Sequence, residues 1–113
     1  MDTPLALQAL AALAQETRLS AFRLLVEAGS AGLPVGVLRE RLDVPAATLT
    51  AHLNVLRQAA LVEDEREGRV IRVRANYPRM NALLGYLTEN CCRGDAACSP
   101  NQPCKPSRPG AKR

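Results

Sequence analysis

Residues 44–62 read VPAATLTAHLNVLRQAALV, and this stretch predicts a turn, an amphipathic helix and the start of a strand. Leu49, Leu53, Leu56 and Ala60 recur at helical spacing and form one apolar face. The other side of the helix carries small and polar side chains, namely Ala47, Thr48, Thr50, Ala51 and Asn54. Such a helix is expected to be docked on one side and free on the other.

A shorter helix is predicted immediately upstream, over residues 34–42, with Val35, Leu38 and Leu42 inward. Three residues separate the two helices, and this arrangement is typical of a helix-turn-helix, whose second helix lies in the DNA major groove. A hydroxyl such as that of Thr50 can donate to a phosphate or a base edge, and the alanine methyls can meet thymine methyls. The alternative is the solvated face of an ordinary helical hairpin.

The 113 residues are enough for one domain, which we place at residues 1–94, followed by a tail at residues 95–113. Trp is absent and aromatic residues make up 3% of the chain, so a core of Leu, Val and Ala is expected, in a mainly helical fold. The net charge of +4 suits a polyanionic partner, although part of it comes from the tail. Neither a signal peptide nor a membrane-spanning run is evident, so a cytoplasmic protein is expected.

Two further helices are predicted before the helix-turn-helix. Thr3 and Pro4 form a candidate cap and first position for a helix that carries Leu7, Leu10 and Leu13. The second helix, over residues 16–28, is expected to bury Leu19, Phe22 and Val26 and to end at Gly29. Its arginines, Arg18 and Arg23, are expected to be exposed and solvated, and the alternative is that either contacts a phosphate.

After the recognition helix the pattern changes to a period of two residues. Residues 62–66 and 70–74 flank the turn Glu67-Gly68-Arg69 and predict a β-hairpin, the wing of a winged helix. Four arginines could reach phosphates or the minor groove: Arg66, Arg69, Arg72 and Arg74. Because four acidic residues lie among them, only Arg66 and Arg69, near the tip, are taken as DNA contacts. An edge hairpin with arginines for solubility is the alternative.

A last helix is predicted after Asn76, which is a good cap, with Pro78 in the first turn. Its apolar stripe consists of Met80, Leu83, Leu84 and Leu87. In so small a chain the first and last helices have few partners, so they are the candidate interface of a two-fold dimer. Such a homodimer would present two recognition helices to an inverted repeat. The alternative is that both stripes close a monomeric core.

The order of helices, helix-turn-helix, wing and last helix resembles the ArsR/SmtB family of metalloregulatory repressors. The similarity covers residues 5–87 and rests on LAALAQETRLSAFRLL, TLTAHLNVLRQAALV and EDEREGRVIRVR, in which His52 and Leu53 match the family's His-Leu pair. It implies a homodimer that represses by binding double-stranded operator DNA and dissociates when a metal or metalloid binds. Two departures are Pro45-Ala46-Ala47, where the family commonly has Ser and Gln, and Val35-Gly36-Val37, where many arsenic sensors carry a Cys-x-Cys box.

All four cysteines lie between Cys91 and Cys104, which indicates metal-binding or redox-active sulfur rather than a disulfide framework. Cys91, Cys92 and Cys98 are similar to a minority arrangement of the family that binds trivalent arsenic. Arsenic(III) favours three thiolates in a pyramid, whereas structural zinc usually takes four ligands. We therefore expect arsenite, or the related antimonite, at these three cysteines. Cys104 could instead complete a site for zinc, cadmium or lead, and a thiol redox switch is a further alternative.

Enzymatic activity is not expected. The chain has no Cys-x-x-Cys and no βαβ pattern for a thiol oxidoreductase, and no nucleophile–base pair for hydrolysis. His52 lies within the recognition helix, far along the chain from every cysteine, so it is expected to pack or hydrogen-bond there. Residues 99–113, which are rich in Pro, Lys and Arg, are expected to be disordered.

Overall fold

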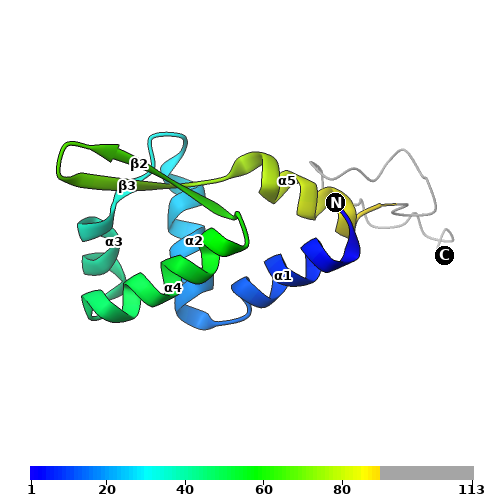
Figure 1. Cartoon of the computed structure of the whole chain (residues 1–113), viewed down its shortest axis with the longest axis horizontal. Coiled ribbons are helices and arrows are strands. Elements are labelled where there is room, and N and C mark those ends of the chain that lie inside the picture. Colours follow the sequence, from blue (N-terminus) through cyan, green and yellow to red (C-terminus); the bar gives the residue numbers. More distant parts are fainter. Residues whose placement is uncertain (90–113) are drawn as a thin grey trace, which may run out of the picture.

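The computed structural model describes residues 1–89, which form a mainly helical winged helix-turn-helix. The elements, in chain order, are α1 (Thr3–Leu13), α2 (Glu16–Ala28), β1 (Leu33–Pro34), α3 (Val35–Leu42), α4 (Ala46–Gln58), β2 (Val62–Glu67), β3 (Val70–Ala75) and α5 (Tyr77–Leu87). This order confirms the predicted fold class, to which the structure adds the short strand β1. The three helices α2, α3 and α4 lie around the core, and the hairpin extends above them (Figure 1).

The core is built from leucines of α2, α3 and α4, together with a few residues of the sheet. The largest fully buried side chains are Leu25, Leu38, Leu49, Leu53, Leu56, Leu61 and Val73. Burying a leucine contributes about 1.5–3 kcal/mol, so these side chains dominate the stability of the fold. The prediction for Leu19 was wrong, because the buried stripe of α2 consists of Ala21, Phe22 and Leu25, and Leu19 lies beside it, 45% exposed.

Helix α1 buries alanines, and its leucines other than Leu13 are exposed. Its buried residues are Ala6, Ala9 and Ala12, whereas Leu7 is 61% exposed and Leu10 is 39% exposed. The predicted N-cap of this helix, Thr3, was wrong by one residue, because the cap is Asp2. The carboxylate of Asp2 accepts from the Leu5 N–H at 3.1 Å, and the hydroxyl of Thr3 lies 2.6 Å from that of Tyr86 on α5. An Asp cap is favoured because its side chain satisfies a free N–H of the first turn.

Helix α4 ends earlier than its apolar pattern predicts. The last helical residue is Gln58, Ala59 is buried, and Ala60 has a left-handed backbone with φ +62°. The Leu61 N–H donates to the Leu56 carbonyl at 3.0 Å, and the Ala60 N–H donates to the Arg57 carbonyl at 2.9 Å. This is a Schellman ending, so Ala60 does not continue the buried stripe as predicted.

The sheet has the order β1-β3-β2, with both pairs antiparallel. The hairpin is confirmed, and each strand is one residue longer than predicted, since Glu67 pairs with Val70. Gly68 is the first of two loop residues and has φ +61°, which is the glycine position of a type II′ turn. Pro34, predicted to begin the helix, lies in β1 and precedes α3.

Asn76 caps α5 as predicted and also joins it to the end of α4. Its side-chain oxygen accepts from the Arg79 N–H at 3.2 Å, while its amide nitrogen donates to the Ala60 carbonyl at 2.8 Å. The hydroxyl of Tyr77 donates to the Val26 carbonyl at 2.9 Å, which fixes α5 on the end of α2. The wing is therefore followed directly by an anchored helix.

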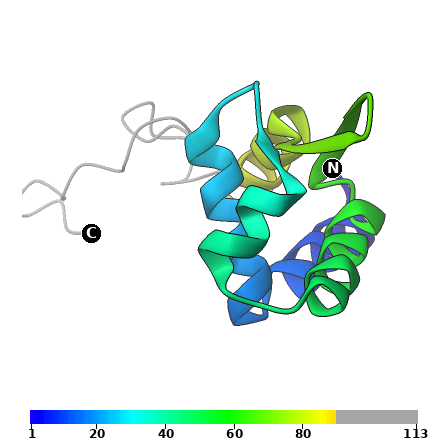
Figure 2. The same ribbon diagram turned by 90° about the vertical axis from the view of Figure 1, so that its left-hand side faces the viewer.

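The long axis of the molecule separates two groups of elements. Helix α3, the beginning of α4 and the hairpin tip lie at one end, and α1 and α5 extend toward the other (Figure 1). A view along this axis shows α4 and the hairpin on the same side of the molecule (Figure 2). Within residues 1–89, no helix is both long and apolar enough to cross a membrane.

Candidate nucleic-acid interface

The outer face of α4 is free of bulky side chains. Leu49, Leu53 and Leu56 fix the opposite face in the core, at 1% exposure or less. All five predicted contact residues of this helix are exposed: Ala47, Thr48, Thr50, Ala51 and Asn54. The result is a helix surface of methyl, hydroxyl and amide groups that can approach another molecule closely. These groups can hydrogen-bond to, or make apolar contact with, base edges in a major groove.

The beginning of α4 leaves backbone donors available. Pro45 occupies the cap position, no side chain caps the helix, and the first turn carries no acidic residue. The first N–H groups of a helix have no partner within the helix, and they carry the positive end of the helix dipole. This end therefore suits an anion such as a phosphate group.

The other end of α4 is connected to the wing by Arg57, a residue that the sequence analysis did not identify. Its Nη1 donates to Asn54 Oδ1 at 2.8 Å, and its Nε lies 2.9 Å from Asp64 Oδ2 on β2. The second contact is an ion pair whose angle falls outside hydrogen-bond geometry. The hydrogen bond from Arg57 thus orients the side chain of Asn54. The spacing of three residues between Asn54 and Arg57 on a helix was the signal that could have found this pair.

The wing is acidic along one side and basic at its tip. Arg72 Nε lies 2.9 Å from Glu67 Oε1, and Arg74 reaches both Glu63 and Glu65 at 3.2 and 3.1 Å. Arg72 and Arg74, which the sequence analysis left out of the DNA contacts, are thus held by carboxylates of the wing itself. Within residues 1–89, the ion pairs include neither Arg66 nor Arg69, and both side chains are exposed.

Arg18 and His52 contact each other between α2 and α4. Arg18 was expected to be exposed, but it is half-buried, because its Nε donates to the Ala12 carbonyl at 2.6 Å. Its Nη1 lies 3.2 Å from Nδ1 of His52. The expectation that His52 packs or hydrogen-bonds within the recognition helix is confirmed.

The predicted metal ligands Cys91, Cys92 and Cys98, like Cys104, lie outside the described residues. Within residues 1–89, no group of three or more His, Cys, Asp or Glu side chains is placed to hold a metal ion. The metalloid site therefore stays a prediction from the sequence.

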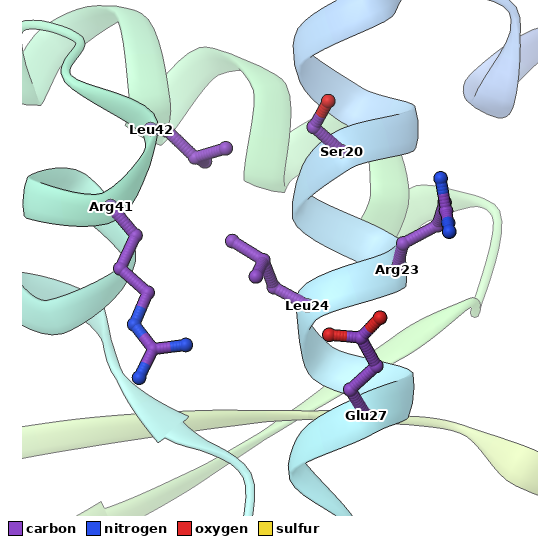
Figure 3. Close-up of a pocket in the computed structure, with 6 residues that line it drawn as sticks. All are labelled: Ser20, Arg23, Leu24, Glu27, Arg41 and Leu42. Carbon is purple, nitrogen blue, oxygen red and sulfur yellow. The ribbon is translucent and has the colours of Figure 1, made fainter.

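A shallow hollow of about 430 Å³ lies between α2 and α3 (Figure 3). Leu24 and Leu42 point into it, and the charged side chains of Arg41 and Glu27 lie at its edge. It contains none of the predicted DNA-contact residues, so the candidate interface remains the outer face of α4 with the wing tip.

Comparisons with known proteins agree with this architecture. A family model described as a helix-turn-helix domain matches residues 13–65. A search of curated protein sequences gave no match. Among solved structures, an ArsR-like transcriptional regulator from a Rhodococcus species is 33% identical, with 74% of this chain and 76% of that chain covered and a TM-score of 0.65.

Two further structures resemble the chain over most of its length. HlyU from Vibrio cholerae is 28% identical, with 80% of this chain and 95% of that chain covered and a TM-score of 0.64. The other is a homodimeric winged helix-turn-helix DNA-binding domain from Mycobacterium bovis, described as a possible ArsR-family regulator. It is 22% identical, with 85% of this chain and 89% of that chain covered and a TM-score of 0.61. At that identity the last likeness shows the fold alone.

The similarity to the Rhodococcus regulator extends over about three quarters of both chains. The structure of this chain has the elements expected of such a regulator, namely a helix with a free outer face, α4, and a wing. This chain belongs to the ArsR family of DNA-binding transcriptional regulators.

Proposed function

We propose that this ArsR-family regulator is a homodimeric repressor that leaves its operator when trivalent arsenic binds Cys91, Cys92 and Cys98. The observation that carries the DNA-binding part is the outer face of α4, where the five predicted contact residues are exposed and small. A repressor acts where DNA is held, so we place the protein in the cytoplasm.

The proposed DNA contacts divide into base readout and backbone contacts. Thr50 and Asn54 hydrogen-bond to base edges, and Ala47 and Ala51 meet thymine methyls in the major groove. The uncapped N–H groups at the beginning of α4, with Thr48, bind a phosphate. Arg66 and Arg69 at the wing tip reach phosphates or the minor groove beside it.

The homodimer is proposed to form through α1 and α5. In residues 1–89, most exposed large apolar side chains lie on these helices or just before them: Met1, Leu5, Leu7, Leu10, Leu84 and Leu87. Exposed large apolar side chains that gather on two helices in contact with each other are typical of an interaction site. The domain from Mycobacterium bovis is described as homodimeric, and a two-fold dimer of this chain would match an inverted repeat in DNA.

The inducer is inferred from the chemistry of the cysteines. Three thiolates close in sequence suit the pyramidal coordination of arsenic(III) or antimony(III). Cys91 follows the end of α5 by four residues, and α5 belongs to the proposed dimer interface. A ligand that binds the released form more tightly shifts the equilibrium away from DNA. Coupling of about 1–3 kcal/mol would weaken operator binding roughly 5–150-fold.

The test is fluorescence anisotropy of the reduced full chain on labelled operator DNA, titrated separately with arsenite, antimonite and zinc. We expect release by arsenite and antimonite. The variants Cys91→Ser, Cys92→Ser and Cys98→Ser should bind DNA as tightly as the wild type and no longer respond, whereas Cys104→Ser should respond normally. Release by zinc with loss of response in Cys104→Ser would point to a four-sulfur metal site. Release only on oxidation of the thiols would point to a redox sensor.

A further inference from the structure

Arg18 lies where three helices of the structure meet. It is the third residue of α2, and its backbone N–H donates to the capping side chain of Gln15 at 2.9 Å. Its Nε donates to the carbonyl of Ala12 in the last turn of α1, at 2.6 Å, and its Nη1 lies 3.2 Å from Nδ1 of His52 in α4. One half-buried side chain therefore joins the end of α1 to the middle of the recognition helix.

The chemistry of these contacts makes them directional. A guanidinium only donates hydrogen bonds, so Nδ1 of His52 is the acceptor, and an imidazole that accepts at Nδ1 carries its proton on Nε2. The guanidinium is also planar and rigid, so its Nε and Nη1 have a fixed relative position. The position of the Ala12 carbonyl therefore constrains the position of His52 through Arg18.

The leucines beneath α4 constrain the helix in a different way. Leu49, Leu53 and Leu56 hold the helix on the core through apolar burial, which has no directional preference. The fully buried residues of α1 are alanines, so this helix contacts α2 and α4 largely through small side chains. The directional hydrogen bond from Arg18 adds to this burial a constraint on the position of α4 relative to α1.

We propose that Arg18 is a positioning residue that sets the orientation of the recognition helix relative to α1. The inference rests on the proposed function, because it takes α4 as the helix that reads DNA and α1 as part of the dimer interface. In a two-fold dimer each subunit has its own Arg18, which connects α1 to α4. The two arginines together then set the angle between the two recognition helices. A change in the packing of α1 is then transmitted to the DNA-binding surface through Arg18 and His52.

The first test replaces Arg18 with Gln in the full chain and measures operator affinity by anisotropy over a series of salt concentrations. Circular dichroism verifies that the variant is folded at the temperature used. We expect binding to weaken roughly five- to fiftyfold, as for other coupled contacts. The slope of log K against log salt should stay unchanged, because a residue that acts only through His52 makes no phosphate contact. Arg23→Gln, which alters an exposed arginine of the same helix, is the matched control and should bind as the wild type does.

Two variants of His52 keep the test independent of how well the Arg18 variant folds. His52→Gln retains an acceptor for the guanidinium and should stay close to wild-type affinity, whereas His52→Leu removes the acceptor and should match Arg18→Gln. The double variant Arg18→Gln, His52→Leu should bind the operator no more weakly than either single variant, since both substitutions remove the same hydrogen bond.

A spectroscopic readout needs no DNA. The chain contains one histidine, so its imidazole signals in long-range proton–nitrogen NMR spectra need no assignment. We expect a neutral ring protonated on Nε2 in the wild type and a mixture of tautomers in Arg18→Gln. A mixture of tautomers in the wild type would overturn the link.

The outcomes separate the two proposals. If the wild type binds operator DNA and folded Arg18→Gln binds it equally well, the positioning role is wrong and the proposed function stands. A fall in the salt slope of about 0.9 would mean that Arg18 contacts a phosphate, which also overturns the role. If the wild type shows no specific DNA binding, both proposals fail together.

Discussion

At the scale of single residues, Gly32 shows how closely the loop after α2 approaches the sheet. Its backbone has φ +68°, and a Cβ built on it would lie 2.3 Å from the Val73 carbonyl oxygen and 2.9 Å from Cβ of Arg74. Both neighbours belong to β3, and neither can move without disturbing the strand. Glycine is the residue that satisfies the left-handed backbone and the close approach together.

Gly32→Ala is therefore expected to lower the free energy of unfolding by about 2–4 kcal/mol, through backbone strain and a clash with β3. Gly36→Ala is the matched control, because Gly36 lies in α3 with no atom within 4 Å of its added Cβ. The control should leave stability unchanged or raise it by up to about 1 kcal/mol. Urea unfolding followed by circular dichroism measures both. Equal effects in the two variants would contradict this account of Gly32.

Some single residues could be predicted from the sequence, and others could not. The cap at Asn76 follows from its residue type and the proline that comes after it. Nothing in an alanine marks the left-handed backbone of Ala60, which depends on hydrogen bonds donated by Leu61 and by Asn76, the cap of α5. The exposure of Leu19 likewise follows from which stripe of α2 the other helices cover, and not from its own apolar character.

At the scale of elements, the wing combines an acidic side with a basic tip. Glu63, Glu65 and Glu67 follow one side of β2 and pair with arginines of β3. These carboxylates keep phosphates away from that side, because like charges repel. Arg66 and Arg69 at the tip are left to face DNA, and the wing is therefore expected to contact DNA through its tip.

We predict that Arg69→Ala and Arg66→Ala each weaken binding to all DNA sequences alike and lower the salt slope by about 1. Arg72→Ala is the control, since Arg72 already pairs with Glu67 and its loss should leave the slope unchanged. Anisotropy titrations on specific and unrelated duplexes at several salt concentrations give these slopes. A slope that falls as far in Arg72→Ala as in Arg69→Ala would show that the wing lies differently on DNA.

Long elements with a clear period were predictable, and the shortest one was not. The helices and the hairpin follow from apolar spacing, caps and the glycine of the turn. Strand β1 has two residues, too few for a period, and it forms by pairing Leu33 with Val73 from a distant part of the chain. The contact faces of α4 could be predicted because its buried leucines define the opposite side. The link through Arg18 could not, because it depends on how three helices meet.

At the scale of the whole molecule, the proposed dimer surface and the proposed DNA surface lie toward opposite ends. Helices α1 and α5 extend toward one end, and the wing tip and the beginning of α4 lie at the other (Figure 1). A two-fold axis near α1 and α5 would therefore place the two recognition helices on the outer parts of the dimer. This arrangement fits two half-sites about one helical turn of DNA apart.

The dimer predicts that Leu7→Lys and Leu87→Lys produce monomers. Each leucine is more than half exposed in one subunit, and each substitution occurs twice in a two-fold dimer. With about 1.5–3 kcal/mol per leucine, dimerisation should weaken more than about a hundredfold. Val70→Lys changes an exposed apolar residue of the wing and should leave the dimer intact. Sedimentation equilibrium measures all three, and dimers of unchanged affinity in the α1 and α5 variants would place the interface elsewhere.

Selection of duplexes from a random DNA library by the reduced 113-residue chain tests whether two copies of α4 read an operator. We expect enrichment of an inverted repeat with half-sites about one turn apart, bound with a steep dependence on salt. Thr50→Ala and Asn54→Ala should change which bases are enriched within each half-site. A pool that stays random after repeated rounds, or an enriched sequence without two-fold symmetry, would contradict the claim that two recognition helices read an operator.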